Sequence, residues 1–130
     1  MRLPLVQRSV PIFNTSPMVG RLILACVIIH IVVVLLPLPV AYELIERFAF
    51  ISARYTISGA WQFDPIAYGF APLTHLFLHG GFLHLLMNMA MLLAFGTPIE
   101  RRMSALSFVA FYVICGVAGA ALWAAFHPHT

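Results

Sequence analysis

Long apolar segments alternate with short polar ones along this chain of 130 residues. Three apolar segments stand out, at residues 19–38, 82–97 and 103–126. An α-helix rises about 1.5 Å per residue, so a helix of about 20 residues spans the roughly 30 Å hydrocarbon core of a bilayer. The pattern therefore predicts an all-α membrane protein with three transmembrane helices. The segment at 73–79 either lengthens the second helix or forms a separate short helix that leads into it.

The segment at 41–72, between the first two predicted spans, has a different character. Charged and aromatic side chains alternate in it, a mixture that favours the membrane–water interface. Glu43, Glu46 and Arg47 fit a short amphipathic helix, so this interfacial connection is either a loop with aromatic anchors or a structured element half immersed in lipid. We divide the chain into a head at 1–17, a single domain at 18–126 and an end at 127–130.

Composition supports a membrane protein and argues against nucleic-acid binding. Hydrophobic residues make up 62% of the chain and charged residues 8%, against about 25% charged residues in soluble domains. The mean hydropathy is +0.99. The net charge of +3 comes from few residues, and no basic patch alternates with aromatic residues. The lipid bilayer is therefore the expected partner, and no nucleic acid is expected.

The arginines predict an orientation. Five of the seven fall on one side of the predicted membrane: Arg2, Arg8, Arg21, Arg101 and Arg102. Only Arg47 and Arg54 fall on the other side. Because positively charged connections stay in the cytoplasm, we expect a cytoplasmic N-terminus and an outward-facing segment at 41–72. The first apolar segment is longer than the core of a signal peptide, so we expect a retained span, in a bacterial inner membrane.

Four polar side chains interrupt the apolar sequence between residues 75 and 88: His75, His79, His84 and Asn88. Polar groups are costly in lipid and usually have a function there. The spacing of four residues places His75 with His79, and His84 with Asn88, on one face of a helix. Such residues suit a metal or haem site, hydrogen bonds that tie helices together, or an oxyanion site built from His and Asn donors.

A metal site is the weakest of these alternatives. No carboxylate lies near the histidines in the sequence apart from Asp64. Cys26 and Cys115 lie inside apolar runs without metal-type spacing, so we interpret them as core residues that form no disulfide. We assign no metal and no cofactor to the chain.

The same stretch resembles the second transmembrane segment of rhomboid intramembrane serine proteases. The resemblance rests on His75-x3-His79-x4-His84-x3-Asn88, Gly96 and Glu100-Arg101-Arg102, and covers about residues 12–126. It implies a six-helix bundle, of which this chain supplies three transmembrane helices, and a water-filled cavity open to the outer side. It also implies cleavage of transmembrane protein substrates by a serine–histidine pair.

The resemblance implies a role for each polar residue of this stretch. His84 and Asn88 would donate hydrogen bonds to the oxyanion and so belong to the catalytic site. His79 would line the active-site cavity, and His75 would support the cavity mouth.

The resemblance also implies structural roles outside that stretch. Glu100 and Arg102 would brace the turn between the second and third spans. The segment at 41–72 would be the family's membrane-embedded first loop. Some bacterial members have a Trp-Arg pair in this loop, whereas here Trp61 is followed by Gln62.

The sequence contains no Gly-x-Ser-Gly, the motif that carries the family's serine nucleophile. A nucleophilic serine also needs an adjacent base, which the resemblance places on a sixth span. We therefore expect the N-terminal half of a protease, a fragment inactive on its own that self-associates or pairs with the missing spans. The alternatives are a non-proteolytic rhomboid-like protein that binds membrane clients, and an unrelated three-span metal or haem protein.

Overall fold

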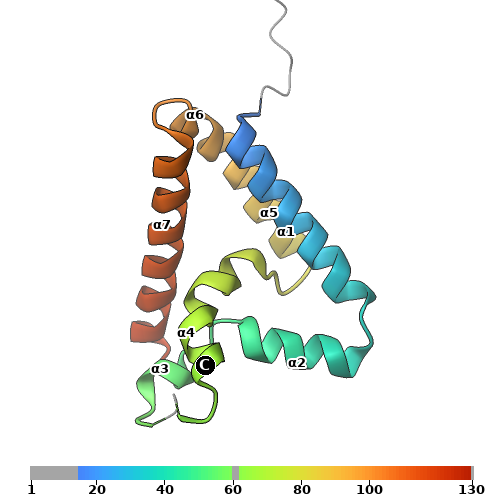
Figure 1. Ribbon diagram of the computed structural model, residues 1–130, viewed down its shortest axis with the longest axis vertical. Coiled ribbons are helices and arrows are strands. Elements are labelled where there is room, and N and C mark those ends of the chain that lie inside the picture. The colour runs from blue at the N-terminus through green and yellow to red at the C-terminus, as the bar shows by residue number, and fades with distance from the viewer. Residues whose placement is uncertain (1–14, 60–61, 130) are drawn as a thin grey trace, which may run out of the picture.

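The computed structural model describes residues 15–59 and 62–129, and these ranges contain helices and connecting backbone but no strand (Figure 1). Within them, three helical segments are long and apolar enough to cross a membrane: Pro17–Leu35, Phe82–Glu100 and Ala105–Phe126. The predicted fold class, an all-α membrane protein with three transmembrane helices, is confirmed. Most of the predicted head at 1–17 lies outside the described residues, as do Trp61 and Thr130.

The first span is α1 (Pro17–Leu35), which ends before the predicted boundary at residue 38. Proline restricts the residue before it to extended backbone, and Leu36, which precedes Pro37, is extended with φ −72° and ψ 150°. Pro39 lies in the first turn of the next helix, α2 (Leu38–Phe48), where a missing N–H group has no cost. The two prolines therefore separate two helices.

The connection at 41–72 is structured, so the simple-loop alternative is wrong. It contains most of α2, the short helix α3 (Ala53–Thr56) and most of α4 (Pro65–Thr74). In α2, the charged side chains Glu43, Glu46 and Arg47 are exposed, as an amphipathic helix requires. Figure 1 shows α2 lying across the end of α1, and α2 packs against α4.

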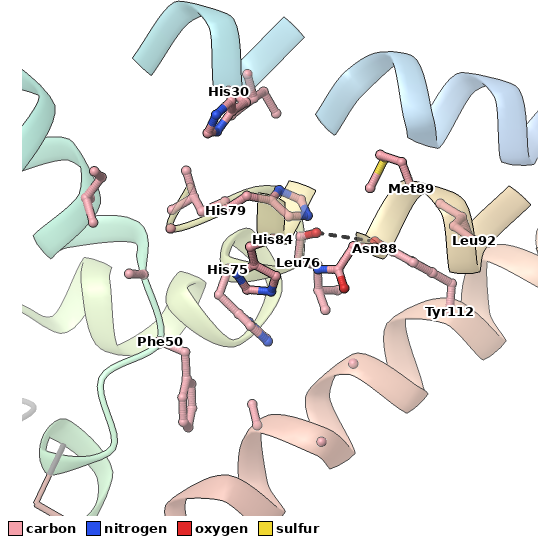
Figure 2. Close-up of a pocket in the computed structure, with 18 of the residues that line it drawn as sticks. His30, Phe50, His75, Leu76, His79, His84, Asn88, Met89, Leu92 and Tyr112 are labelled. Carbon is pink, nitrogen blue, oxygen red and sulfur yellow. Dashed lines mark hydrogen bonds between the residues drawn. The ribbon is translucent and has the colours of Figure 1, made fainter. Parts of the chain in front are cut away.

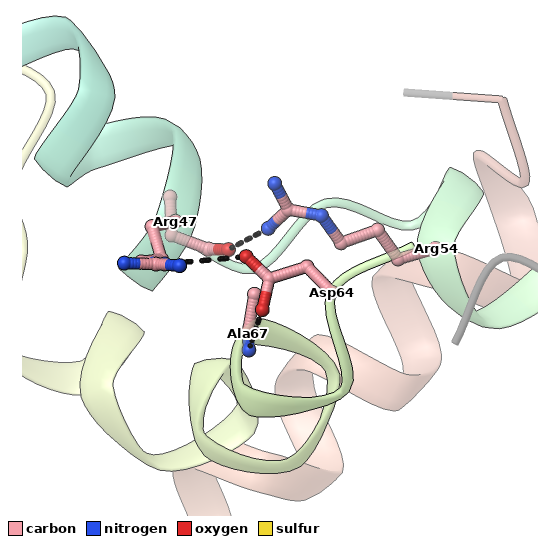
Figure 3. A network of polar contacts seen from close by, with 5 residues as sticks. Arg47, Arg54, Asp64 and Ala67 are labelled. Carbon is pink, nitrogen blue, oxygen red and sulfur yellow. Dashed lines mark hydrogen bonds and ion pairs between the residues drawn. The ribbon is translucent and has the colours of Figure 1, made fainter. Parts of the chain in front are cut away.

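Asp64 connects α2 and α4 at the surface (Figure 3). Its side chain caps α4 by accepting from the Ala67 N–H at 2.9 Å, and it accepts from Nε of Arg47 at 3.2 Å. Arg54 lies beside this pair and donates to the Ala49 carbonyl at 3.4 Å. The Ala67 N–H and then Arg47 lower the pKa of Asp64 below its ordinary value. The carboxylate is therefore ionised at neutral pH and joins the two helices there.

The segment at 73–79 forms a separate element and does not lengthen the second span. After α4, the chain continues as a 3-10 turn, η2 (His75–Phe77), and becomes extended at Leu78. In Figure 1, this part of the chain rises between α1 and α7 (Ala105–Phe126). Helix α1 contacts η2, and α7 contacts α4. A bend at Gly80 and Gly81 then leads into the second span.

The second span consists of α5 (Phe82–Met91), a π-helical turn η3 (Leu92–Gly96) and α6 (Thr97–Glu100). It ends three residues beyond the predicted boundary at residue 97. Pro98 does not stop the helix, because it lies in the first turn of α6 directly after the widened π turn. The predicted end of the span at this proline is therefore wrong, because Pro98 lies at a boundary between two helical segments inside the span.

A small core holds the spans together where α1, α6 and α7 converge. Its buried members are Val19, Leu22 and Phe108. Gly96 permits this convergence, because a Cβ at this position would lie 2.9 Å from Cγ2 of Val19 and 3.3 Å from Cζ of Phe108. Elsewhere the spans expose large apolar side chains, such as Leu106 at 80%, which suits contact with lipid or with other membrane helices.

Candidate functional site

A partly open cavity of about 800 Å³ lies between the spans (Figure 2). Residues of α1, α2, η2, α5 and α7 line it. Its polar lining consists of His30, His75, His79, His84, Asn88 and Tyr112. All four polar residues that the sequence singled out between 75 and 88 therefore face one cavity. Its volume lies within the usual range for small-molecule and substrate pockets.

His75 and His79 do not share a helix, so the prediction of a helical His-x3-His pair is wrong. His75 begins the 3-10 turn, whereas His79 lies in the non-helical connection after it. Nδ1 of His75 contacts the Ala71 carbonyl at 3.0 Å, and Nδ1 of His79 contacts the Phe77 carbonyl at 3.3 Å. Because a carbonyl only accepts, Nδ1 carries the proton in each neutral ring and Nε2 is an acceptor.

His79 and His84 meet across the start of α5. Their ring centroids are 5.5 Å apart, in an edge-to-face arrangement. Burial lowers the pKa of His79 below its ordinary value, which favours the neutral ring at neutral pH. Asn88 follows His84 by one turn of α5, and the side chains of both residues are exposed to the cavity. The predicted helical spacing of His84 and Asn88 is therefore confirmed.

Two further polar residues of the cavity were missed from the sequence. His30 lies on α1, and Tyr112 lies on α7. His30 carries the same signal as the four residues that were found, since it is the one histidine in the first apolar segment. Tyr112 carries no such signal, because a tyrosine in an apolar helix is common.

Glu100 connects the second span to the first. Its carboxylate is buried and accepts hydrogen bonds from the backbone N–H groups of Met18 at 2.9 Å and Val19 at 2.8 Å, and from the Ser16 hydroxyl. These N–H groups belong to the first turn of α1, where no intrahelical acceptor exists. Glu100 therefore caps α1 from another helix. The expected role of Glu100, bracing the turn between the second and third spans, did not include this contact with the first span. Arg102 is exposed at that turn.

The described side chains offer no metal site. Within residues 15–59 and 62–129, no group of three or more His, Cys, Asp or Glu side chains is arranged to hold a metal ion. Cys26 and Cys115 are free thiols, the first buried and the second exposed. The polar lining of the cavity offers imidazole, amide and phenol groups, which can donate and accept hydrogen bonds.

A family model for the rhomboid domain matches residues 69–130. The matched range contains the cavity residues of η2, α5 and α7 together with Glu100 and Arg102, and begins after α1 and α2. No curated protein and no solved structure matches the chain.

Proposed function

We propose that the cavity of this chain is the oxyanion half of an intramembrane serine protease site, because a family model for the rhomboid domain matches residues 69–130. The substrates are transmembrane proteins whose peptide bonds enter the cavity from the bilayer. The observation that carries the proposal is the convergence of His75, His79, His84 and Asn88 on one open cavity. A site that opens between membrane helices is accessible to a segment of another membrane protein.

His84 and Asn88 are the proposed oxyanion donors. An imidazole N–H and an amide N–H lie one helical turn apart, and both line the cavity. When a peptide carbonyl is attacked, its oxygen becomes negatively charged, and donors aimed at this oxygen stabilise the transition state. Their place on a helix holds them in position before the reaction, so little reorganisation is needed.

The other predicted residues have supporting roles in this proposal. His79 lies against His84 and restricts the orientation of its ring, while His75 supports the cavity mouth beside Phe50, whose ring centroid is 5.5 Å away. Glu100 holds the second span against α1, and Arg102 supports the following turn from its exposed face. None of these four residues is proposed to contact the peptide bond that is cleaved.

The serine nucleophile and its base come from elsewhere in this proposal. None of the described serines lines the cavity, and the sequence contains no Gly-x-Ser-Gly. The resemblance to the family places the serine at the start of a fourth span and the base histidine on a sixth. Those spans would cover the open side of the cavity and shield its polar residues from lipid.

The test is to join the chain, or co-express it, with three spans of a rhomboid protease that carry Gly-x-Ser-Gly and the base histidine. Cleavage of a fluorescent transmembrane substrate is measured in proteoliposomes. We expect cleavage only when both halves are present. A folded, assembled complex that does not cleave any of a panel of transmembrane substrates would refute the proposed function.

The absence of a serine from the described cavity lining favours one alternative function, a rhomboid-like protein that binds membrane clients without cutting them. The same reconstitution separates the two functions. Binding of a labelled transmembrane peptide to the chain, together with no cleavage in the assembled complex, is the result that this alternative predicts. Replacement of Asn88 would then leave peptide binding unchanged.

We also propose that the N-terminus lies in the cytoplasm of a bacterial cell. Arg21 near the start of α1 and the pair Arg101 and Arg102 lie at the same end of the bundle, whereas Arg47 and Arg54 lie at the α2–α3 end (Figure 1). Alkaline phosphatase is active only outside the cytoplasm. We expect an active fusion after residue 130 and an inactive one after Arg102; the reverse pattern would overturn the orientation.

A further inference from the structure

We propose that Tyr112 and Gly116 of α7 are positioning residues that hold the 3-10 turn at Leu76. They thereby set the position of the His79 ring relative to the His84 ring. The structural part of this inference concerns the chain as it stands, and only its catalytic consequence rests on the proposed function. Tyr112 and Gly116 lie one helical turn apart on α7 and therefore share a face. Leu76 contacts both of them, through its backbone and its side chain respectively.

The backbone contact supplies hydrogen bonds to a carbonyl at the end of a helix. The helical backbone stops at Phe77, and carbonyls in the last turn of a helix have no intrahelical donor. The hydroxyl of Tyr112 donates to the Leu76 carbonyl at 3.2 Å, which Figure 2 shows as a dashed line. From the other side, the thiol of Cys26 on α1 lies 4.0 Å from the same oxygen. Helices α1 and α7 therefore hold the turn between them through their contacts with the Leu76 carbonyl.

The side-chain contact depends on the missing Cβ of Gly116. A Cβ built at this position would lie 2.0 Å from Cδ2 and 3.2 Å from Cγ of Leu76. The Leu76 side chain thus occupies the space that any larger residue at 116 would need. Gly119, three residues later on the same helix, also lines the cavity but has open space in the direction of a Cβ. Of these two glycines, only Gly116 therefore receives the turn.

The turn is close enough to the site for its position to matter. Only Phe77 and Leu78 separate Leu76 from His79, and His79 is held to the Phe77 carbonyl. A displacement of Leu76 is therefore passed to His79 over a short stretch of backbone. Because the His79 ring lies against the ring of His84, a shift of one changes the environment of the other.

The first test uses the 130-residue chain in detergent micelles and needs no activity. The ring C–H resonances of His79 and His84 are recorded by NMR for wild type, Tyr112→Phe, Gly116→Val and the control Ala121→Val. Ala121 is an exposed residue of α7 that does not line the cavity. We expect both resonances to move in the first two variants and to stay near wild type in the control. The exchange variant Leu76→Ala/Gly116→Val should return them, because it removes the side chain that valine displaces. Equal shifts in the Gly116 and Ala121 variants would overturn the inference.

The second test measures kcat and KM in the assembled protease. Overpacking of a tight contact should lower kcat about tenfold in Gly116→Val with little change in KM, and the exchange variant should recover most of it. Loss of one hydroxyl in Tyr112→Phe should cost about three- to tenfold in kcat. An inactive wild-type assembly refutes the proposed function and leaves the NMR result to decide on the turn. An active assembly that tolerates Gly116→Val as well as Ala121→Val refutes the positioning role.

Discussion

Replacing Asn88 by alanine should lower kcat of the assembled protease about 100-fold or more, with a much smaller change in KM. The amide of Asn88 is expected to meet the substrate oxygen mainly when negative charge develops on it. An interaction made only in the transition state affects kcat, and one oxyanion donor contributes about 3 kcal/mol to its stabilisation. Single-turnover cleavage of a fluorescent transmembrane substrate in proteoliposomes measures the effect directly.

Met87 provides the matched control for this experiment. It neighbours Asn88 on α5, is 56% exposed and does not line the cavity. Met87→Ala should therefore keep kcat close to wild type. His84→Ala should behave like Asn88→Ala, and the double variant should lose less than the product of the two effects if both donors act on one oxygen. An unchanged rate in Asn88→Ala would remove this residue from the oxyanion role.

Replacing Glu100 by alanine should lower the free energy of unfolding by roughly 3 kcal/mol, the largest stability effect that we expect for a single side chain. The substitution leaves two buried N–H groups of α1 and the Ser16 hydroxyl without their acceptor. Each unsatisfied buried donor costs about 1–3 kcal/mol, and the three contacts share one carboxylate, so the effects do not simply add. Equilibrium unfolding in mixed micelles, followed by circular dichroism, measures the change.

Two comparisons separate capping by Glu100 from a general effect of charge. Glu100→Gln keeps one acceptor oxygen and should cost about half as much as alanine. Glu46→Ala removes a carboxylate from the exposed face of α2 and should change stability by less than about 0.5 kcal/mol. Equal stability of Glu100→Ala and Glu46→Ala would show that the contact with α1 contributes nothing.

The spans could be predicted from the sequence because the bilayer imposes a simple requirement on composition and length. Apolar runs long enough to cross the membrane located all three spans, with boundaries that differ by up to three residues. The two largest differences arise at prolines. Pro37 and Pro39 end α1 earlier than the apolar run does, and Pro98 begins a further turn of helix where an end was expected.

The cavity could be predicted only in part. The four polar residues between 75 and 88 were found because each is costly in lipid, and they do line one cavity. Their helical pairing was half right: it holds for His84 with Asn88, and it fails for His75 with His79, where the helix stops at Phe77. Periodicity describes residues within one continuous helix, and so it carries no information across such a break.

The amino-acid sequence by itself determined the membrane environment, the three spans, the amphipathic α2 and the polar residues of the second span, since each follows from local hydrophobicity and spacing. Tertiary structure alone decided that His30 and Tyr112 join the cavity, that Glu100 caps α1, and that Leu76 packs on Gly116. The hydrogen bonds among these contacts join residues that are between 36 and 84 positions apart in the chain. Burial makes an unpaired polar group expensive, so the partner is set by which helices come together, and no local pattern encodes that partner.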